Sequence, residues 1–225
     1  MTATLELQGV HYAYRDSRAT KTVLSGVGYT FEAGRTYAIT GPSGAGKTTL
    51  LALLAGLDAP TAGSVRYGGE DIREIGLDAY RRSHTATIFQ DLNLLDYLTP
   101  IENITTGMAL SGVSTDGAAE RAAELLTGLG IAPAEHNRST TRLSGGQQQR
   151  VAVARAIACD VTVLLADEPT GSLDEENTET VMSALRSLAH EQGWCVIIVT
   201  HSRAVARSCD VLLRLQRGKL TARQA

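Results

Sequence analysis

Residues 41–49 read GPSGAGKTT and match the phosphate-binding pattern G-x-x-x-x-G-K-[ST]. Glycine lets the backbone fold closely around an anion, so that several N–H groups point at it, and the following helix adds its positive end. Lys47 would reach the β- and γ-phosphates of a nucleotide, and the Thr48 hydroxyl would bind Mg²⁺. A chance glycine turn is the alternative, but a strand pattern before the motif and a helix pattern after it favour the phosphate site. The predicted nucleotide-binding residues are Gly41, Pro42, Ser43, Gly44, Ala45, Gly46, Lys47, Thr48 and Thr49.

Two adjacent acids end the apolar segment VTVLLADEPT. Asp167, at the end of the predicted strand, is placed to hold Mg²⁺ as a Walker-B aspartate does. Glu168 is placed to polarise an attacking water as a general base. The alternative, an acidic strand end that caps the next helix, is common. In a chain that also has a phosphate-binding loop, two acids in this position favour catalysis.

Two more polar side chains follow predicted strands. His201 comes after WCVIIVT and would bind a γ-phosphate or the attacking water, and Gln90 ends HTATIFQ and would offer its amide oxygen to Mg²⁺. A lone histidine is more often an ordinary polar residue. However, ligands of open α/β sheets bind at the carboxyl ends of the strands, where Gly41 and Asp167 are also expected. We therefore predict that the four residues converge on one site.

Residues 143–150 read LSGGQQQR and place a second glycine-rich turn at the start of a second helix. Locally, Ser144 and Gln147 predict an S-x-x-Q capping box. That does not explain Gly145 and Gly146, because glycine at a helix start costs stability. Glycine is useful where another group approaches the backbone, and a helix N-terminus is an anion site. Since the first loop already holds the chain's own nucleotide, we predict that residues 144–147 clamp the γ-phosphate of a nucleotide held by a second copy.

The elements that must position these residues predict an α/β fold. Short strand patterns over residues 4–31 suggest an antiparallel opening, followed by the strand RTYAIT and the helix after the phosphate loop. Residues of about 91–160 lose strand patterns and are rich in Ala, Leu, Glu and Arg, which predicts a mainly helical insertion. Strands return as VTVLLAD, WCVIIVT and VLLRLQ, with a helix between the first two. The order predicts a sheet with helices packed on it.

Composition argues against several classes of protein. Lys and Arg total 21 against 24 Asp and Glu, a net charge of −3, which gives no reason to expect nucleic acid as a partner. The three cysteines have no metal-like spacing and predict reduced thiols in a cytosolic protein. The longest apolar runs, VTVLLA and WCVIIV, are too short to cross a bilayer, so a soluble chain is expected whose membrane role comes through a partner.

Together these motifs resemble those of ATP-binding cassette (ABC) ATPases in order and approximate spacing. The resemblance covers almost the whole chain and implies a P-loop NTPase (RecA-like) core, with an N-terminal antiparallel β region and an inserted helical subdomain, in a single domain over 1–225. It further implies a head-to-tail dimer of two copies, in which ATP lies between one copy's phosphate loop and the other's Ser144, Gly145, Gly146 and Gln147. Asp174 would belong to the loop that connects the two sites. Tyr14 aligns with the aromatic residue that stacks on adenine, although Tyr12 is two residues away.

A narrower resemblance to the MacB/LolD-type subgroup rests on GPSGAGKTTLLALLAGLDAPTAGSV, IFQDLNLLDYLTPIENI and DEPTGSLD. It implies an ATP-hydrolysing motor, with ATP and Mg²⁺, that drives an integral membrane permease in the export or extraction of a lipoprotein, haem, peptide or macrolide-type substrate. The chain would then lie at the cytoplasmic face of the membrane, bound through the permease. An FtsE-like cell-division ATPase and a soluble non-transport ABC ATPase are the alternatives. A regulator without hydrolysis conflicts with the presence of Glu168 and His201.

The segment DLNLLDYLTPIENI directly follows Gln90 and contains closely spaced large apolar residues. Those residues are Leu94, Leu95, Tyr97, Leu98 and Ile101. They either pack inside the helical region or form the contact with the permease. The second alternative is implied by similar transporters, in which a short permease helix enters the groove beside this loop. We predict that part of the segment is the permease contact.

Overall fold

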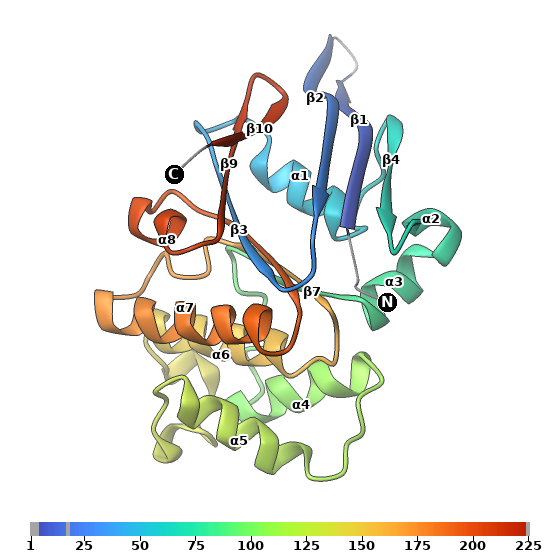
Figure 1. The fold of residues 1–225 in the computed structure, drawn as a ribbon. Coiled ribbons are helices and arrows are strands. Elements are labelled where there is room, and N and C mark those ends of the chain that lie inside the picture. The colour runs from blue at the N-terminus through green and yellow to red at the C-terminus, as the bar shows by residue number, and fades with distance from the viewer. Residues whose placement is uncertain (1–4, 17–18, 224–225) are drawn as a thin grey trace.

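Two β-sheets and the helices around them make up the computed structural model, which describes residues 5–16 and 19–223. The first sheet has the strand order β2-β1-β4-β5, and every neighbouring pair is antiparallel. Its strands are β1 (Leu5–Asp16), β2 (Ala19–Phe31), β4 (Ala62–Tyr67) and β5 (Glu70–Asp71). The sheet occupies the upper part of the molecule in Figure 1. The predicted antiparallel N-terminal region is therefore confirmed.

The second sheet has six strands in the order β10-β9-β3-β8-β7-β6, and only the β10–β9 pair is antiparallel. Its strands are β3 (Arg35–Thr40), β6 (Thr85–Ile88), β7 (Val163–Asp167), β8 (Cys195–Val199), β9 (Val211–Gln216) and β10 (Lys219–Arg223). Strands β7 and β8 are buried at every residue, as their continuous apolar sequences predict for parallel strands covered on both faces. Because the five parallel strands run in one direction, their carboxyl ends meet at one edge.

Helices cover both faces of this parallel sheet. On one face, α1 (Lys47–Leu54) packs in a core shared with β1 and β2 and with Leu165 and Ile197 of the sheet. On the other face, Leu164 and Ile198 pack in a core with α6 (Gly145–Ile157) and α7 (Glu175–His190). The alternation follows from the period of two along a strand. Figure 1 accordingly shows α1 between the two sheets and α6 and α7 below the parallel one.

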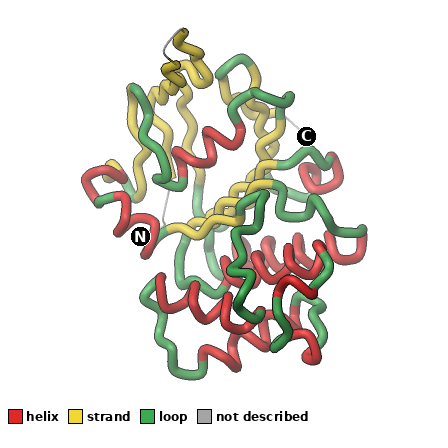
Figure 2. The backbone as a smooth tube through the Cα atoms, turned by 180° about the vertical axis from the view of Figure 1, so that it is seen from behind, coloured by secondary structure: helices red, strands yellow, loops and turns green. Residues whose placement is uncertain are grey.

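The region that the sequence predicts to be helical contains α4 (Pro100–Leu110), α5 (Ala118–Gly128) and α6, which contact one another. Between them the chain is less regular: residues 91–99 form no helix, and 129–144 contain only two short 3₁₀ turns. The view from behind in Figure 2 shows most of the helical turns in the lower half and the strands in the upper half, where shorter helices also lie. Among the described residues, no helix has the length and apolar character needed to cross a bilayer.

Three short helices complete the fold and were not predicted from the sequence. They are α2 (Ile72–Ile75), α3 (Leu77–Ser83) and α8 (Arg203–Arg207). Each is too short for an apolar period to stand out in the sequence. The α8 helix matters for the site because it follows directly after β8 and His201.

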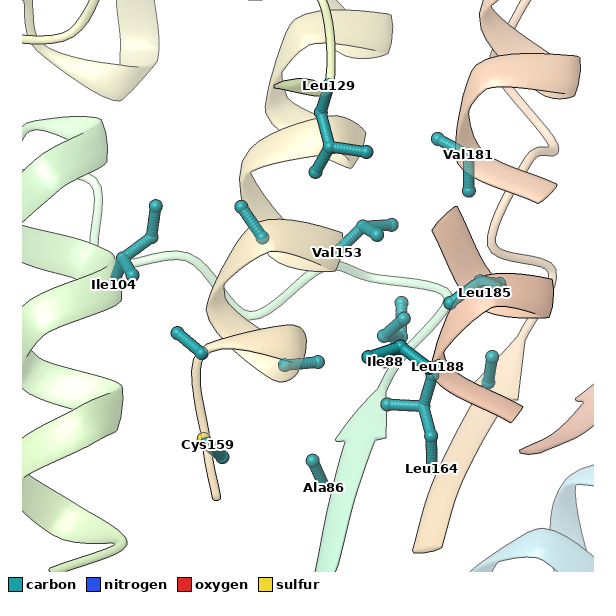
Figure 3. Packing of buried hydrophobic residues seen from close by; sticks show 14 of the residues in the cluster. Ala86, Ile88, Ile104, Leu129, Val153, Cys159, Leu164, Val181, Leu185 and Leu188 are labelled. Atoms are coloured by element: carbon teal, nitrogen blue, oxygen red, sulfur yellow. The ribbon is translucent and has the colours of Figure 1, made fainter. Parts of the chain in front are cut away.

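The core below the parallel sheet joins the helices to the strands that carry the site. In Figure 3, Leu185 and Leu188 of α7 lie beside Ile88 of β6 and Leu164 of β7, with Val153 of α6 nearby. All five side chains are almost completely buried. Because protein interiors are close-packed and resist deformation, this core holds β6, β7, α6 and α7 in a fixed relation.

Candidate functional site

The phosphate loop connects β3 to α1, as its sequence predicts. Its first and third glycines are required by close contacts. A Cβ at Gly41 would lie 2.2 Å from the backbone oxygen of Leu215, and one at Gly46, whose φ is 96°, would lie 2.4 Å from Val23 Cγ1. Any side chain at either position would push the loop away from β9 or β2. The loop is therefore shaped by the strands on both sides of it.

Lys47 is a buried cation at the centre of this loop, with 7% of its surface exposed. Its Nζ donates hydrogen bonds to the backbone oxygens of Gly41, at 3.0 Å, and Pro42, at 3.2 Å. Among the residues whose side chains the structure describes, 5–14 and 20–222, no salt bridge includes it. A buried positive charge held only by neutral carbonyl groups is suited to an anionic ligand. The carbonyl groups do not neutralise the Lys47 ammonium group, whereas a phosphate would. The donor set of the loop therefore fits a nucleotide phosphate.

Thr48 and Asp167 come together from α1 and β7. The Thr48 hydroxyl donates a hydrogen bond to Asp167 Oδ2 at 2.8 Å. An alcohol and a carboxylate oxygen side by side, next to a phosphate cradle, are the ligand types that Mg²⁺ prefers. The two oxygens fit the metal that the sequence predicts.

Glu168 has an unusual backbone, with a φ of 51° in the left-handed region. Such conformations cost free energy in a non-glycine residue and persist only where the surroundings hold them. Here the Glu168 N–H donates to the Val199 oxygen at 2.9 Å, and the Glu168 oxygen accepts a hydrogen bond from Gln149 Nε2 at 2.7 Å. The strain turns the carboxylate toward the end of β8, where the Thr200 hydroxyl donates to Oε2 at 3.2 Å.

The second carboxylate oxygen of Glu168 has no such partner. Glu168 Oε1 is buried and makes no hydrogen bond with any described residue, and His201 Nε2 is 3.8 Å away. A buried acceptor without a partner is costly and rare, so it marks a place where another donor is expected. A water molecule between Glu168 and a phosphate is such a donor.

His201 and Gln90 both follow strands of the parallel sheet, as predicted, but the structure places them differently. A cavity of about 520 Å³ is lined by His201 together with Gly41, Thr40 and Thr200, so the histidine lies beside the start of the phosphate loop. Gln90 lies two residues beyond β6, in a turn, and its side chain is exposed. None of the hydrogen bonds among the described residues involves Gln90. The structure thus brings Thr48 and Asp167 into contact and leaves Gln90 outside that contact.

The two candidate adenine-stacking tyrosines differ in exposure. Tyr14 is 52% exposed, its hydroxyl is 3.0 Å from Thr49 Oγ1, and it lines a cavity of about 240 Å³ with Lys47 and Thr48. Tyr12 is buried and donates a hydrogen bond to Asp58, which raises the pKa of Tyr12 to about 12. Since stacking needs a free aromatic face beside the phosphate loop, the geometry favours Tyr14.

The turn at Ser144 forms the capping box that the sequence predicts. The Gln147 N–H donates to Ser144 Oγ at 3.2 Å, and the Ser144 N–H donates to Gln147 Oε1 at 2.8 Å. The two glycines then separate in role. A Cβ at Gly146 would lie 3.2 Å from Leu173 Cδ2, so packing explains this glycine, whereas a Cβ at Gly145 would meet nothing within 4 Å. Only Gly145 has the free space that approach by another molecule requires.

Asp174 caps α7 and lies close to the Ser144 helix. It accepts hydrogen bonds from the Asn177 backbone at 2.8 Å and from the Asn177 side chain at 2.7 Å, and these bonds lower the pKa of Asp174. Asn177 in turn accepts a hydrogen bond from Arg150 of α6. The loop from Glu168 to Asp174 therefore begins at the acidic strand end and finishes against the helix that starts at Ser144.

Sequence reasoning missed two residues that hold the site. Thr200 binds Glu168 directly, and Gln149 binds both the Glu168 oxygen and the Ser172 N–H, the latter at 3.1 Å. Thr200 could have been found by its place between a buried strand and His201. Gln149 carried a weaker signal, a glutamine that the helical period places on the same side as apolar residues.

The Ser144 turn does not line the cavities beside the phosphate loop. Three cavities of about 520, 370 and 240 Å³ are lined by residues of that loop, and among their described lining residues none comes from 143–150. Ser144 is exposed. Among the described residues of one chain, the two glycine-rich turns thus line no common cavity of these three.

Comparison with known proteins gives a consistent result. Residues 24–171 match the family described as "ABC transporter". The ABC transporter ATP-binding protein YclH of Bacillus subtilis (strain 168) is 38% identical over 220 residues, which are 98% of this chain and 96% of YclH. The macrolide export ATP-binding/permease protein MacB 1 of Yersinia pestis bv. Antiqua (strain Antiqua) is 40% identical over 225 residues. These residues cover 99% of this chain but 34% of MacB 1, so the chain spans about a third of that relative.

Solved structures agree with the sequence relatives. The dimeric structure of a post-hydrolysis state of the ATP-binding cassette MJ0796, bound to ADP and Pi, matches with a TM-score of 0.91 at 32% identity, covering 98% of this chain and 99% of that chain. A bacterial Atm1-family ABC exporter with ATP bound matches with a TM-score of 0.82 at 28% identity, covering 98% of this chain and 38% of that chain.

Proposed function

Because this chain belongs to the ABC transporter family and is an ATPase with the fold of its cassettes, we propose that it works as a head-to-tail dimer that drives an integral membrane permease. The observation that carries the proposal is the grouping of Thr48, Asp167 and Glu168. It joins a phosphate cradle, a pair of metal-type ligands and a buried carboxylate oxygen without a partner. That combination is suited to water attack on a phosphate held by Lys47.

Each residue of the proposed site has one task. Backbone N–H groups of the loop and Lys47 bind the phosphates of ATP, and Tyr14 stacks on the adenine. Thr48, Asp167 and Gln90 would hold Mg²⁺, which supplies charge neutralisation on the phosphates when bound. Glu168 accepts a proton from the attacking water, and His201 donates a hydrogen bond to the γ-phosphate. Thr200 and Gln149 keep Glu168 in its strained conformation.

A second copy completes the site. Ser144, Gly145, Gly146 and Gln147 lie away from the chain's own phosphate loop, and the open space over Gly145 supports approach by another molecule. In a two-fold dimer, each copy's helix start would bind the γ-phosphate held by the other. The dimeric form of the MJ0796 cassette supports this arrangement. Asp174, at the end of the connecting loop, then lies between the two sites.

The permease is proposed from the relatives and from one surface. MacB 1 is by name an ATP-binding/permease protein, and its similarity supports a MacB/LolD-type motor at the cytoplasmic face of a membrane, acting in export or extraction. In the segment after Gln90, Leu94 and Ile101 pack against the core, so the interior alternative fits those two residues. Tyr97 is 81% exposed, which supports it as the permease contact.

A charged substitution tests this contact. We expect Tyr97→Glu to change the free energy of unfolding of the isolated chain by no more than about 0.5 kcal/mol, because the side chain lies in solvent. The same change should uncouple ATP hydrolysis from transport in membranes that contain the permease. Leu110→Glu is the matched control, since Leu110 is another exposed apolar side chain, 71% exposed, at the end of α4. If ATP hydrolysis is coupled to transport equally well in wild type and in Tyr97→Glu, Tyr97 is not part of the permease contact.

The purified chain provides the direct test of the function. We expect Mg²⁺-dependent release of phosphate from ATP, with a specific activity that rises with protein concentration until dimers saturate. Phosphate release and the dimer fraction from light scattering are measured on the same samples. Specific activity that stays constant down to dilutions without detectable dimer would rule out the shared site.

A further inference from the structure

Arg155 of α6 reaches across to the loop that follows Gln90. Its Nη1 donates to the Asn93 oxygen at 2.6 Å, and its Nη2 donates to the Leu92 oxygen at 2.7 Å. Leu92 and Asn93 have φ values of 58° and 48°, so two consecutive non-glycine residues are left-handed. Residues adopt such conformations only where their surroundings hold them, and the Arg155 guanidinium holds both of these carbonyl groups.

Helix α4 makes room for the Arg155 side chain. A Cβ at Gly107 would lie 2.9 Å from Arg155 Cγ, closer than real Cβ atoms approach. Glycine inside a helix is unfavourable, so its presence at this place needs a reason. The reason is the passage of the Arg155 stem over α4 at this position.

The charge of Arg155 is used for carbonyl binding rather than for an ion pair. In the part of the chain that the structure describes, no salt bridge includes Arg155. Burial lowers the pKa of its guanidinium from the ordinary value. The planar fork of arginine presents two parallel donors, and lysine, with one ammonium group, cannot reproduce that geometry.

Arg155 binds the part of the loop next to Gln90, whereas Asn103 binds the loop further along the chain, at Leu95. The Leu92 N–H donates to the Phe89 oxygen at 3.0 Å, which closes the turn that contains Gln90. Further along, Asn103 accepts from the Leu95 N–H at 2.8 Å and donates to the Leu95 oxygen at 3.1 Å. Loss of Arg155 should therefore loosen the turn at Gln90 and leave the segment from Leu95 onward in place.

We propose that Arg155 is a positioning residue that fixes the turn of Gln90 to α6, the helix that begins at Ser144. The Gln90 amide is the proposed ligand of Mg²⁺, and Ser144 is proposed to act on the partner's nucleotide. Both are then held by the same helix, α6. This role rests on the proposed function only for the task of Gln90 as a ligand of Mg²⁺.

Amide hydrogen exchange in the nucleotide-free chain gives the first test. We expect Arg155→Lys to speed exchange in residues 91–94 by about tenfold, as loss of a charge-assisted hydrogen bond implies, with no change in α4. Arg121→Lys, an exposed arginine on α5, is the control. Gly107→Ala is the second variant, because its methyl group would push the Arg155 stem away while improving the helix propensity of α4.

The dependence of activity on Mg²⁺ gives the second test. The Mg²⁺ concentration for half-maximal ATPase should rise about tenfold in Arg155→Lys, while ATP binding in the presence of EDTA stays unchanged. In a Gln90→Ala background the same substitution should cause no further rise, because Arg155 acts through Gln90. If Arg155 only stabilised the fold, the effects of Arg155→Lys and Gln90→Ala on the Mg²⁺ concentration for half-maximal ATPase would add.

Three outcomes would overturn the proposal. They are unchanged exchange at residues 91–94, an equal Mg²⁺ shift with and without Gln90, and global unfolding of both Arg155→Lys and Gly107→Ala. Failure of the wild-type chain to hydrolyse ATP would instead reject the proposed function, and the exchange experiment would still decide whether Arg155 holds the turn.

Discussion

We expect Glu168→Gln to reduce ATP turnover by about 10²–10⁴-fold, the range for loss of a general base, and to leave ATP binding intact. The amide keeps the shape of the side chain and an oxygen that can accept the Thr200 hydrogen bond, so the strained backbone is retained. It cannot accept a proton from water. Because the phosphate cradle is formed by other residues, the nucleotide still binds and the ATP-bound dimer accumulates.

Three measurements check this prediction. Phosphate release reports turnover, a fluorescent ATP analogue reports binding, and size-exclusion chromatography with ATP reports the dimer. Glu176→Gln, the same chemical change at an exposed position of α7, is the control. A Glu168→Gln chain that hydrolyses ATP at the normal rate would falsify the assignment of the base.

The positions of the candidate catalytic groups were predictable because they depend on regular elements. The strands RTYAIT, VTVLLAD and WCVIIVT have strong apolar patterns, and parallel pairing brings their carboxyl ends to one edge. Asp167, Glu168 and His201 therefore follow from strand prediction and the order of the chain. The capping box at Ser144 was predictable because it depends only on Ser144 and Gln147, which are close together in the sequence.

The residues that sequence reasoning missed depend on contacts between distant segments. Gln149 and Glu168 are 19 positions apart, and Thr200 and Glu168 are 32 apart, so no local pattern connects them. Gly146 looked like a ligand-approach glycine, but contact with Leu173 explains it, and that contact needs the fold. The choice between Tyr12 and Tyr14 likewise needed the position of Asp58.

The second large effect concerns which chain supplies Ser144. Lys47→Ala removes the buried cation that we propose binds the phosphates, and Ser144→Arg places a bulky side chain at the turn that we propose binds the partner's nucleotide. We expect each variant alone to be inactive. In a head-to-tail dimer, however, a mixed pair contains one composite site with the wild-type phosphate loop of the Ser144→Arg chain and the wild-type Ser144 of the Lys47→Ala chain.

An equal mixture of the two inactive variants should therefore recover about a quarter of wild-type ATPase, since half of the dimers are mixed and each has one of two sites intact. A mixture of Lys47→Ala with Glu168→Gln is the matched control. Lys47 and Glu168 serve the same nucleotide from the same chain, so every site in that mixture carries at least one defect and no activity returns. Differently tagged chains, pulled down with ATP, verify that mixed dimers form in both samples. If mixed dimers form and the first mixture stays as inactive as the second, Ser144 does not act on the partner's nucleotide, and the space over Gly145 serves another purpose.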